Sequence, residues 1–188
     1  MMIKKTSFML MLVLFSISEN VFSQEQMYRT VKGDIALTIT YKDTVIIAAS
    51  NQLIAILDYE TGKIIFRVQY ETFHSGIDSI DNNFKFLTTQ ELHFEGALNI
   101  FINTQKRTPQ KYNMTGMMTS IAFPFPAEGN GTVVCVPAIG DDFVPSCKLI
   151  ATIECKLSQL HLTGIFKNAV NNMQIDLRQS LLEKDKVN

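Results

Sequence analysis

The chain has 188 residues, of which 46% are hydrophobic, and it carries 17 basic and 18 acidic side chains for a net charge of −1. This length is enough for one domain with a sizeable hydrophobic core. The balanced charge argues against a nucleic-acid-binding protein, because such proteins gather basic residues on one face.

The first residues predict an export signal. Lys4 and Lys5 precede a short apolar run, Phe8 to Ile17, and Val21-Phe22-Ser23 offers a cleavage site before Gln24. The apolar run is too short to span a bilayer, which takes about 20 residues. We therefore expect residues 1–23 to be a signal peptide. Residues 24–188 should form a single domain without a membrane span, located in the periplasm or outside the cell.

Alternation of apolar and polar residues begins early in the mature chain. From Val31 to Tyr41 it continues without a break, which predicts a strand with one buried face. The next segment, Val45 to Ser50, fits either a strand or a single helical turn. Gln52 to Phe73 then has two alternating arms around Tyr59-Glu60-Thr61-Gly62, and Gly62 suits a turn that requires a positive φ. This segment predicts a long β-hairpin.

A polar interruption, His74 to Asn83, follows the hairpin and predicts a loop or one short helix near residues 77–84. Alternation returns in two further segments, Leu92 to Ile102 and Tyr112 to Ala122. Both predict strands with one buried face.

The last third of the sequence contains two strong local signals. Phe123-Pro124-Phe125-Pro126 cannot be a central strand, because a proline nitrogen donates no hydrogen bond. Asn130-Gly131 predicts a hairpin turn. Further strands are expected at Thr132 to Val136, Cys147 to Leu157 and Met173 to Arg178, and the charged tail from Glu183 should fray.

These segments together predict an all-β protein of about eight strands joined mostly by short turns. Regular spacing of short strands is typical of a closed antiparallel barrel or a sandwich.

The order of the segments resembles the YceI-like family of exported, lipocalin-like barrels. Three stretches carry the resemblance: VKGDIALTIT, IIAASNQLIAILDYETGKIIFRVQYETF and FKFLTTQELHFEGALNI. Within them, the residues that match the family's patterns are Phe66, Val68, Phe73, Phe94, Gly96 and Leu98. The chain departs from the family at Thr89-Gln90-Glu91, where a proline is usual, and at Phe123 to Pro126, which replaces the family's next motif.

The resemblance implies an antiparallel lipocalin-like barrel that binds a polyisoprenoid or another long-chain lipid without a cofactor. A barrel of eight strands has room for its own side chains or for one slender ligand. The alternation places these residues on the inner face, where they would line the ligand: Leu37, Ile39, Leu53, Leu57, Phe66, Val68, Phe94, Leu98, Leu149, Ile153, Ile175 and Leu177. Small inner residues such as Ala55, Gly96 and Ala151 could leave a tunnel or could be filled by larger neighbours.

Neither a catalytic nor a metal site is expected. His74, His93 and His161 are scattered, and none has a partner at metal-ligand spacing. Binding or transport of an apolar, chain-like molecule is therefore the first hypothesis. The alternative is an envelope β-sandwich, or adhesion module, with a solid core that contacts other proteins through surface loops, with Phe123 and Phe125 as contact residues. Both hypotheses are compatible with a monomer or a homodimer.

The three cysteines permit at most one internal disulfide. Cys147 and Cys155 are too far apart along one strand to bridge each other. Cys135 could pair with either of them, or all three could be buried free thiols that act as small hydrophobic residues, which is the favoured interpretation.

Overall fold

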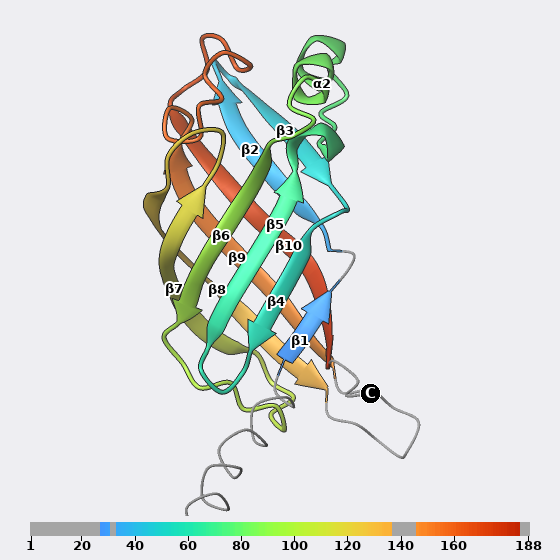
Figure 1. Ribbon diagram of the computed structural model, residues 1–188, viewed down its shortest axis with the longest axis vertical. Coiled ribbons are helices and arrows are strands. Elements are labelled where there is room, and N and C mark those ends of the chain that lie inside the picture. Colours follow the sequence, from blue (N-terminus) through green and yellow to red (C-terminus); the bar gives the residue numbers. More distant parts are fainter. Residues whose placement is uncertain (1–26, 31–32, 137–145, 185–188) are drawn as a thin grey trace, which may run out of the picture.

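Alternating side chains produce one continuous antiparallel sheet that curls around an apolar interior (Figure 1). The computed structural model describes residues 27–30, 33–136 and 146–184. The strands are β1 (Met27–Thr30), β2 (Ile35–Tyr41), β3 (Thr44–Ser50), β4 (Ile54–Asp58), β5 (Lys63–Gln69), β6 (Glu91–Leu98), β7 (Gln110–Thr119), β8 (Phe125–Val136), β9 (Ser146–Lys156) and β10 (Asn172–Lys184). Two helical segments, η1 (Tyr70–Thr72) and α2 (Asp78–Lys85), lie between β5 and β6.

The ten strands follow eight paths around the barrel. Their order is β1-β4-β5-β6-β7-β8-β9-β10-β2-β3, and β1 also pairs with β10, which brings the sheet back to its beginning. β1 and β2 form one interrupted path, while β3 and β4 form the next. Both interruptions lie at the same level, where the Leu53 amide donates to the Gly33 carbonyl at 3.1 Å. The predicted lipocalin-like antiparallel barrel is therefore confirmed, although its sheet has ten strands where the sequence predicted about eight.

The sequence prediction of one unbroken strand from Val31 to Tyr41 was wrong. The regular ladder of β2 begins only at Ile35, and Val31 and Lys32 lie outside the described residues. Perfect alternation could not reveal this interruption, because Gly33 is also buried and keeps the period.

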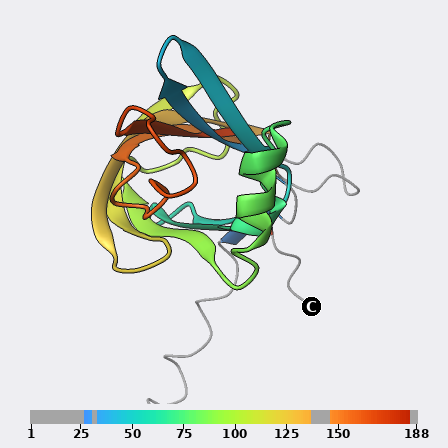
Figure 2. The ribbon, with the colours of Figure 1, turned by 90° about the horizontal axis from the view of Figure 1, so that it is seen from above.

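The barrel wall opens at the upper end in Figure 1, where β3 and β5 separate. β4 pairs with β5, but β3 is joined to the chain after β5 by a single bridge, between Ala49 and His74, and by a hydrogen bond of 2.6 Å between the Ser50 and Thr72 hydroxyls. η1 and α2 lie beside this opening, and the β2–β3 hairpin leans outward from the wall (Figure 2). The short helix predicted near residues 77–84 is thus confirmed, and it lies at the rim of the upper end.

The predicted hairpin around Gly62 is also confirmed. Gly62 has φ +71°, and a Cβ at this position would lie 3.0 Å from the Leu98 carbonyl oxygen. The Asp58 carboxylate stabilises the turn by accepting hydrogen bonds from the Glu60 and Thr61 amides and from the Thr61 hydroxyl.

The predicted turn at Asn130-Gly131 was wrong. Both residues lie inside β8, where Asn130 pairs with Asn113 of β7 and with Thr152 of β9. Glycine is needed here for close approach, because a Cβ on Gly131 would meet the Ile150 carbonyl and would lie 2.6 Å from the Tyr112 hydroxyl oxygen. The glycine therefore marks a crowded point in a strand and not a turn.

The proline-rich segment follows the prediction in part. β8 begins at Phe125 and includes Pro126, which pairs with Met117 of β7. β9 joins β8 only from Gly129 onward, so Pro126 has a neighbouring strand on one side. The position without an N–H therefore faces the side that has no neighbouring strand, and no hydrogen bond of the ladder is lost.

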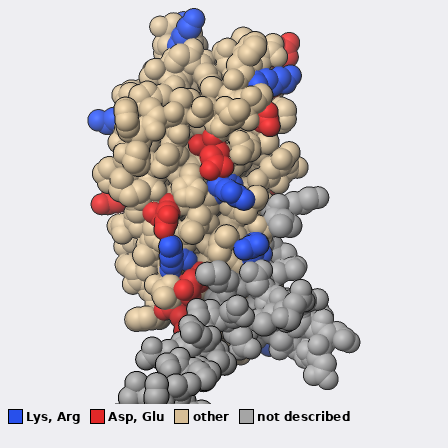
Figure 3. Space-filling model, viewed as in Figure 1, with Lys and Arg blue, Asp and Glu red and all other residues tan. Residues whose placement is uncertain are grey.

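Charged side chains lie on the outside of the barrel, with both signs intermixed on the face seen in Figure 3. Lys63 and Glu95, on neighbouring strands, form an ion pair of 2.7 Å there. The inner faces of the strands instead join into one hydrophobic core. This separation follows from the period of two in the strands, which sends successive side chains to opposite faces.

Candidate functional site

The interior of the barrel is the candidate site. Every residue predicted to line it is on the inner face, and none is more than 6% exposed. All of them belong to the same hydrophobic core: Leu37, Ile39, Leu53, Leu57, Phe66, Val68, Phe94, Leu98, Leu149, Ile153, Ile175 and Leu177. The structure thus brings the predicted set together, while the role of these residues in ligand binding stays a prediction.

Two stacked aromatic rings lie within this core. Phe66 and Phe94 are directly opposite each other on β5 and β6, and their rings stack with centroids 5.1 Å apart. The Phe94 ring folds over Gly96 and Gly116, where a Cβ would lie 2.6 and 2.8 Å, respectively, from its Cζ atom. The space above these two glycines is therefore filled by protein.

A tyrosine covers another glycine, Gly131, in the same way. Tyr112 of β7 reaches across Gly131 and donates a hydrogen bond to the Ile150 carbonyl at 2.9 Å. Burial raises the pKa of Tyr112, so its hydroxyl stays neutral. Tyr112 therefore contacts β7, β8 and β9 from the inside of the barrel and stabilises their packing.

Four aromatic residues close the upper end of the barrel, and the sequence analysis did not predict this cluster. Tyr70 stacks on Phe84 with centroids 6.2 Å apart, and Phe73 and Phe166 also pack against Phe84. Phe84 lies on α2, whereas Phe166 belongs to the segment between β9 and β10. Because the residues of the cluster come from η1, α2 and a loop, they follow no single sequence period. Only the large apolar side chains themselves could have indicated the cluster from the sequence.

A buried hydrogen-bond chain ties this upper end together. The hydroxyls of Tyr70 and Ser120 are 2.6 Å apart, and Ser120 donates to the Leu160 carbonyl at 2.8 Å. Burial raises the pKa of Tyr70 despite the Ser120 hydrogen bond. The chain joins η1, the end of β7 and the β9–β10 connection, and it satisfies polar groups that would otherwise be costly to bury.

The interior of the described part of the chain holds no charged side chain. Its buried polar residues are Thr30, Ser50 and Ser120. The described residues also contain no group of three or more His, Cys, Asp or Glu side chains placed to hold a metal ion. Such an interior can offer dispersion contacts and exclude water, and it would penalise a buried ligand charge.

Cys135 and Cys147 form a disulfide between facing positions of β8 and β9, whereas Cys155 is a free thiol. The favoured prediction of three free thiols was therefore wrong for two of them. Burial raises the pKa of Cys155 to about 12, so this thiol is a poor nucleophile at neutral pH.

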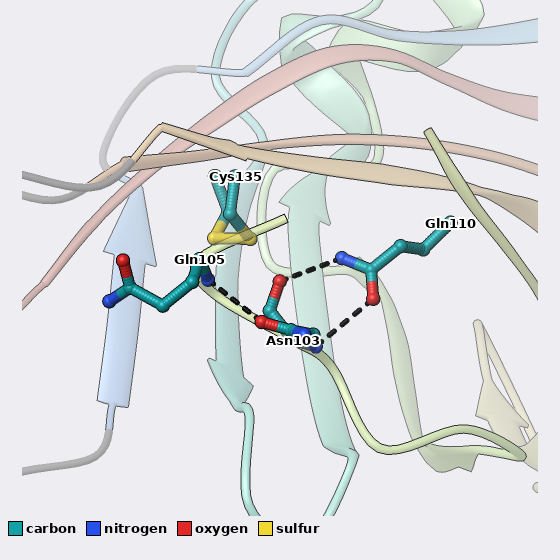
Figure 4. The surroundings of a disulfide bond; sticks show 5 residues. Asn103, Gln105, Gln110 and Cys135 are labelled. Carbon is teal, nitrogen blue, oxygen red and sulfur yellow. Dashed lines mark hydrogen bonds between the residues drawn. A yellow bond between two sulfur atoms is a disulfide. The ribbon is translucent and has the colours of Figure 1, made fainter. Parts of the chain in front are cut away.

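The loop after β6 packs close to the disulfide (Figure 4). Asn103 and Gln110 hold this loop together. The backbone amide of Asn103 donates to Gln110 Oε1 at 3.0 Å, and Gln110 Nε2 donates to the backbone carbonyl of Asn103 at 2.9 Å. The lower end of the barrel is thus fixed by a covalent bond and by a tied loop.

The outer surface carries a shallow groove of about 900 Å³ over β6 to β9, lined by polar residues that include Asn113, Asn130 and Thr152. It opens to solvent on the side of the sheet away from the core. Its chemistry differs from that of the interior, and of the predicted lining residues only Leu98 contributes to it.

Comparison with known proteins gives information on the fold. No family model and no curated protein matches this sequence. A solved structure described as a polyisoprenoid binding domain from Saccharophagus degradans, implicated in plant cell wall breakdown, matches over 87% of this chain and 100% of its own length. The TM-score is 0.62 at 8% sequence identity. The two chains share one fold. The barrel expected from the resemblance to YceI-like proteins is confirmed, and at this identity the likeness concerns the fold.

No helix in the described part of the chain is long and apolar enough to cross a membrane.

Proposed function

We propose that this protein binds an apolar, chain-like molecule, a polyisoprenoid or another lipid, inside its barrel and catalyses no reaction. The observation that carries the proposal is the continuous, uncharged interior, in which the whole predicted lining lies at 6% exposure or less. The solved structure with the same fold is described as polyisoprenoid binding, which supports the proposed class of ligand.

The interior favours an uncharged chain over a charged one. Dispersion contacts with residues such as Phe66, Ile153 and Ile175 reward apolar surface, at about 25 cal/mol for each Å² removed from water before the costs of binding. A phosphate or carboxylate buried among them would have no cation nearby, because the described interior contains none. Any charged head group of the ligand would therefore lie outside the barrel.

The upper end is the proposed access route. It is closed by α2 and by the segment between β9 and β10, whose side chains meet at Phe84 and Phe166 through non-covalent contacts. All the lining residues are buried with this end closed, so a ligand would have to displace these elements to enter. The widening between β3 and β5 lies at the same end (Figure 2).

Native mass spectrometry tests the proposal. The purified chain is measured before and after incubation with a long-chain polyisoprenol, under native and then denaturing conditions. We expect a stoichiometric adduct that is released on denaturation. The matched variants are Ala151→Phe, which adds a ring to the fully buried inner face, and Ala97→Phe, which adds the same ring to the exposed outer face. Ala151→Phe should lose the adduct and Ala97→Phe should keep it.

A bare protein mass under all conditions would overturn the carrier proposal. The second candidate function, an envelope module with a solid core, would then apply, and the rings that fill the space over Gly96 and Gly131 favour it. In that case Ala151→Phe should unfold the protein, because a filled core has no room for a further ring. Phe123, which is 80% exposed in the β7–β8 connection, would be the first residue to test for protein contacts.

We also propose that the protein is exported. The disulfide between Cys135 and Cys147 supports this location, because such bonds persist in oxidising compartments such as the periplasm or the exterior of the cell. Determination of the N-terminal residue of the protein purified from its host tests this part of the proposal. A mature chain that begins at Gln24 is expected, and an intact Met1 would contradict it.

A further inference from the structure

One strand edge of the sheet is left without a partner over most of its length. The strand order ends at β3, whereas β1 pairs on one side with β4 and on the other with β10. Among the described residues, the outer edge of β3 is held only near its C-terminal end, by the isolated bridge between Ala49 and His74 and by the hydrogen bond of 2.6 Å between the Ser50 and Thr72 hydroxyls. An edge of this kind presents backbone N–H and C=O groups that can pair with another chain.

The bridge identifies which groups are available. Ala49 donates to the His74 carbonyl and accepts from the His74 amide, both at 2.9 Å, so its backbone groups point away from β2. In an antiparallel ladder this direction alternates from one residue to the next. Ile47 and Val45 must therefore also direct their N–H and C=O groups outward, and no described residue bonds to these groups.

The side chains at this edge do nothing to protect it. Natural edge strands carry charges, prolines or bulges that prevent pairing. The sequence of β3, TVIIAAS, has neither a charge nor a proline, and it pairs with β2 in regular register from Thr44 to Ser50. Val45 is 57% and Ile47 43% exposed on its outer face. The β2–β3 hairpin leans out from the barrel, and its tip is clear of α2 (Figure 2).

We propose that two copies of this chain pair through β3, antiparallel, with the two-fold axis passing beside Ile46. In this register Val45 lies opposite Ile47 of the second copy, and the converse holds by symmetry. The two N–H and two C=O groups that each copy leaves free at Val45 and Ile47 then form four hydrogen bonds, and no group in this stretch is left over. The two barrels share one continuous sheet.

The residues that flank this register bring no like charges together. Continuing the pairing by two residues brings Asp43 of the second copy opposite Ala49, whose edge is already occupied by His74. The paired stretch therefore ends there, with an exposed carboxylate beside an exposed imidazole. Lys42, the other charge in the turn, lies beyond the paired stretch, so no like charges oppose each other within it.

The side chains also favour a second copy over an unrelated peptide. Val45 and Ile47 of each copy form one four-residue apolar patch across the axis, which removes exposed apolar surface from water. The contact is small compared with interfaces of stable assemblies, which bury about 1,600 Å². The dimer is therefore reversible and forms as the protein concentration rises.

Sedimentation analysis of the full purified chain over a range of concentrations tests the proposal. Wild type should change from monomer to dimer as concentration rises. Ile47→Lys places a charge at the edge, and Val45→Pro removes a free edge donor without removing a β2–β3 bond. Each should raise the dissociation constant at least tenfold. Ile150→Lys is the matched control, because Ile150 is 41% exposed but lies on β9, between two paired strands. It should leave the dissociation constant unchanged.

Thermal unfolding of each variant establishes that its monomer is folded. A chain that stays monomeric at every concentration would overturn the proposal, as would a dimer that survives both Ile47→Lys and Val45→Pro. The register has its own test, because Ile46 directly faces Ile46 of the second copy in a non-hydrogen-bonded pair, with Cα atoms about 4.5 Å apart. In a Cys155→Ser background, oxidation should cross-link Ile46→Cys into a covalent dimer much faster than Thr44→Cys. Equal rates would contradict the proposed register.

Discussion

The two ends of the barrel are closed by different means. At the lower end the Tyr112 side chain spans β7, β8 and β9, and a disulfide joins Cys135 to Cys147. At the upper end, closure depends on Phe84 and Phe166, which come from a short helix and a loop and are held by packing and a few hydrogen bonds. Only the upper end can therefore open without breaking a covalent bond or unpairing the sheet. The barrel thus has one fixed end, the lower one, and one removable end, whose closing helix and loop can be displaced.

The largest effect is expected from a substitution in the hydrophobic core between the two ends. Phe66→Asp removes a fully buried ring and introduces a charge into an uncharged core. Loss of the ring alone costs about 3–5 kcal/mol, and the buried charge adds to it, so the total approaches the whole stability of a typical domain. Far-ultraviolet circular dichroism should show loss of the β-sheet. Arg67→Asp, on the exposed side of the same strand, should stay folded. A Phe66→Asp protein that keeps both its fold and bound lipid would show that Phe66 does not face the interior.

The second effect is expected at the upper end and should leave the lower end unchanged. Phe84→Ala removes the ring at the centre of the upper aromatic cluster, and we expect a loss of about 3–5 kcal/mol in the free energy of unfolding. Hydrogen exchange should accelerate in η1 and in α2 while β7, β8 and β9 stay protected. Phe86→Ala is the control, because Phe86 is 84% exposed and its loss should change stability by less than about 0.5 kcal/mol. Uniform acceleration over the whole barrel would show that the upper end is not a separate unit.

A smaller loss of stability, located at the opposite end of the barrel, is expected when the disulfide at the lower end is removed. The disulfide closes a loop with a sequence separation of 12 residues. Replacing both Cys135 and Cys147 by serine should lower the free energy of unfolding by about 3 kcal/mol, chiefly because the unfolded chain gains freedom. Urea unfolding measures this loss. Hydrogen exchange should rise in β8 and β9 and stay unchanged in α2, and faster exchange in α2 would contradict the independence of the two ends.

The two ends also differ in how far the sequence predicted them. The wall of the barrel could be predicted, because a period of two places residues such as Leu37, Phe66 and Ile153 on one face whatever the tertiary context. The turn at Gly62 and the helix near residues 77–84 were predicted correctly for equally local reasons. The upper cluster could not be predicted in this way, since Tyr70, Phe84 and Phe166 meet only after the sheet has curled.

The errors at the lower end have a different cause. Glycine has two uses in β-structure, in turns and at points of close approach, and a local rule cannot distinguish them. Asn130-Gly131 fitted a turn, but Gly131 is required because Tyr112 crosses it. The disulfide likewise depends on the register of β8 against β9, which places Cys135 opposite Cys147. The twelve lining residues were placed on the inner face by sequence alone, whereas the filling of the space between them depends on ring positions that sequence does not give.

The smallest effect concerns one carboxylate at each end. Asp81 accepts hydrogen bonds from the Ser75 hydroxyl and amide and from the Gly76 amide beside α2. Asp58 has the corresponding role in the lower β4–β5 turn. Partial burial tends to raise the pKa of each carboxyl, but the hydrogen bonds outweigh it, from Ser75 and Gly76 for Asp81 and from Thr61 and Glu60 for Asp58, so that both pKa values are lowered.

Because folding lowers these pKa values, each carboxylate stabilises the native state at pH values above the ordinary Asp pKa of about 4. The contribution is lost as the pH falls from there through the lowered pKa of the folded state. The melting temperature of wild type should therefore decline between about pH 4 and pH 2, and Asp81→Asn and Asp58→Asn should each make this decline shallower. Since Asp81 holds the segment that leads into α2, only Asp81→Asn should also increase hydrogen exchange in that helix at neutral pH. An equal increase in both variants would mean that the lower turn and the upper helix unfold together, which would contradict the division of the barrel into a fixed end and a removable one.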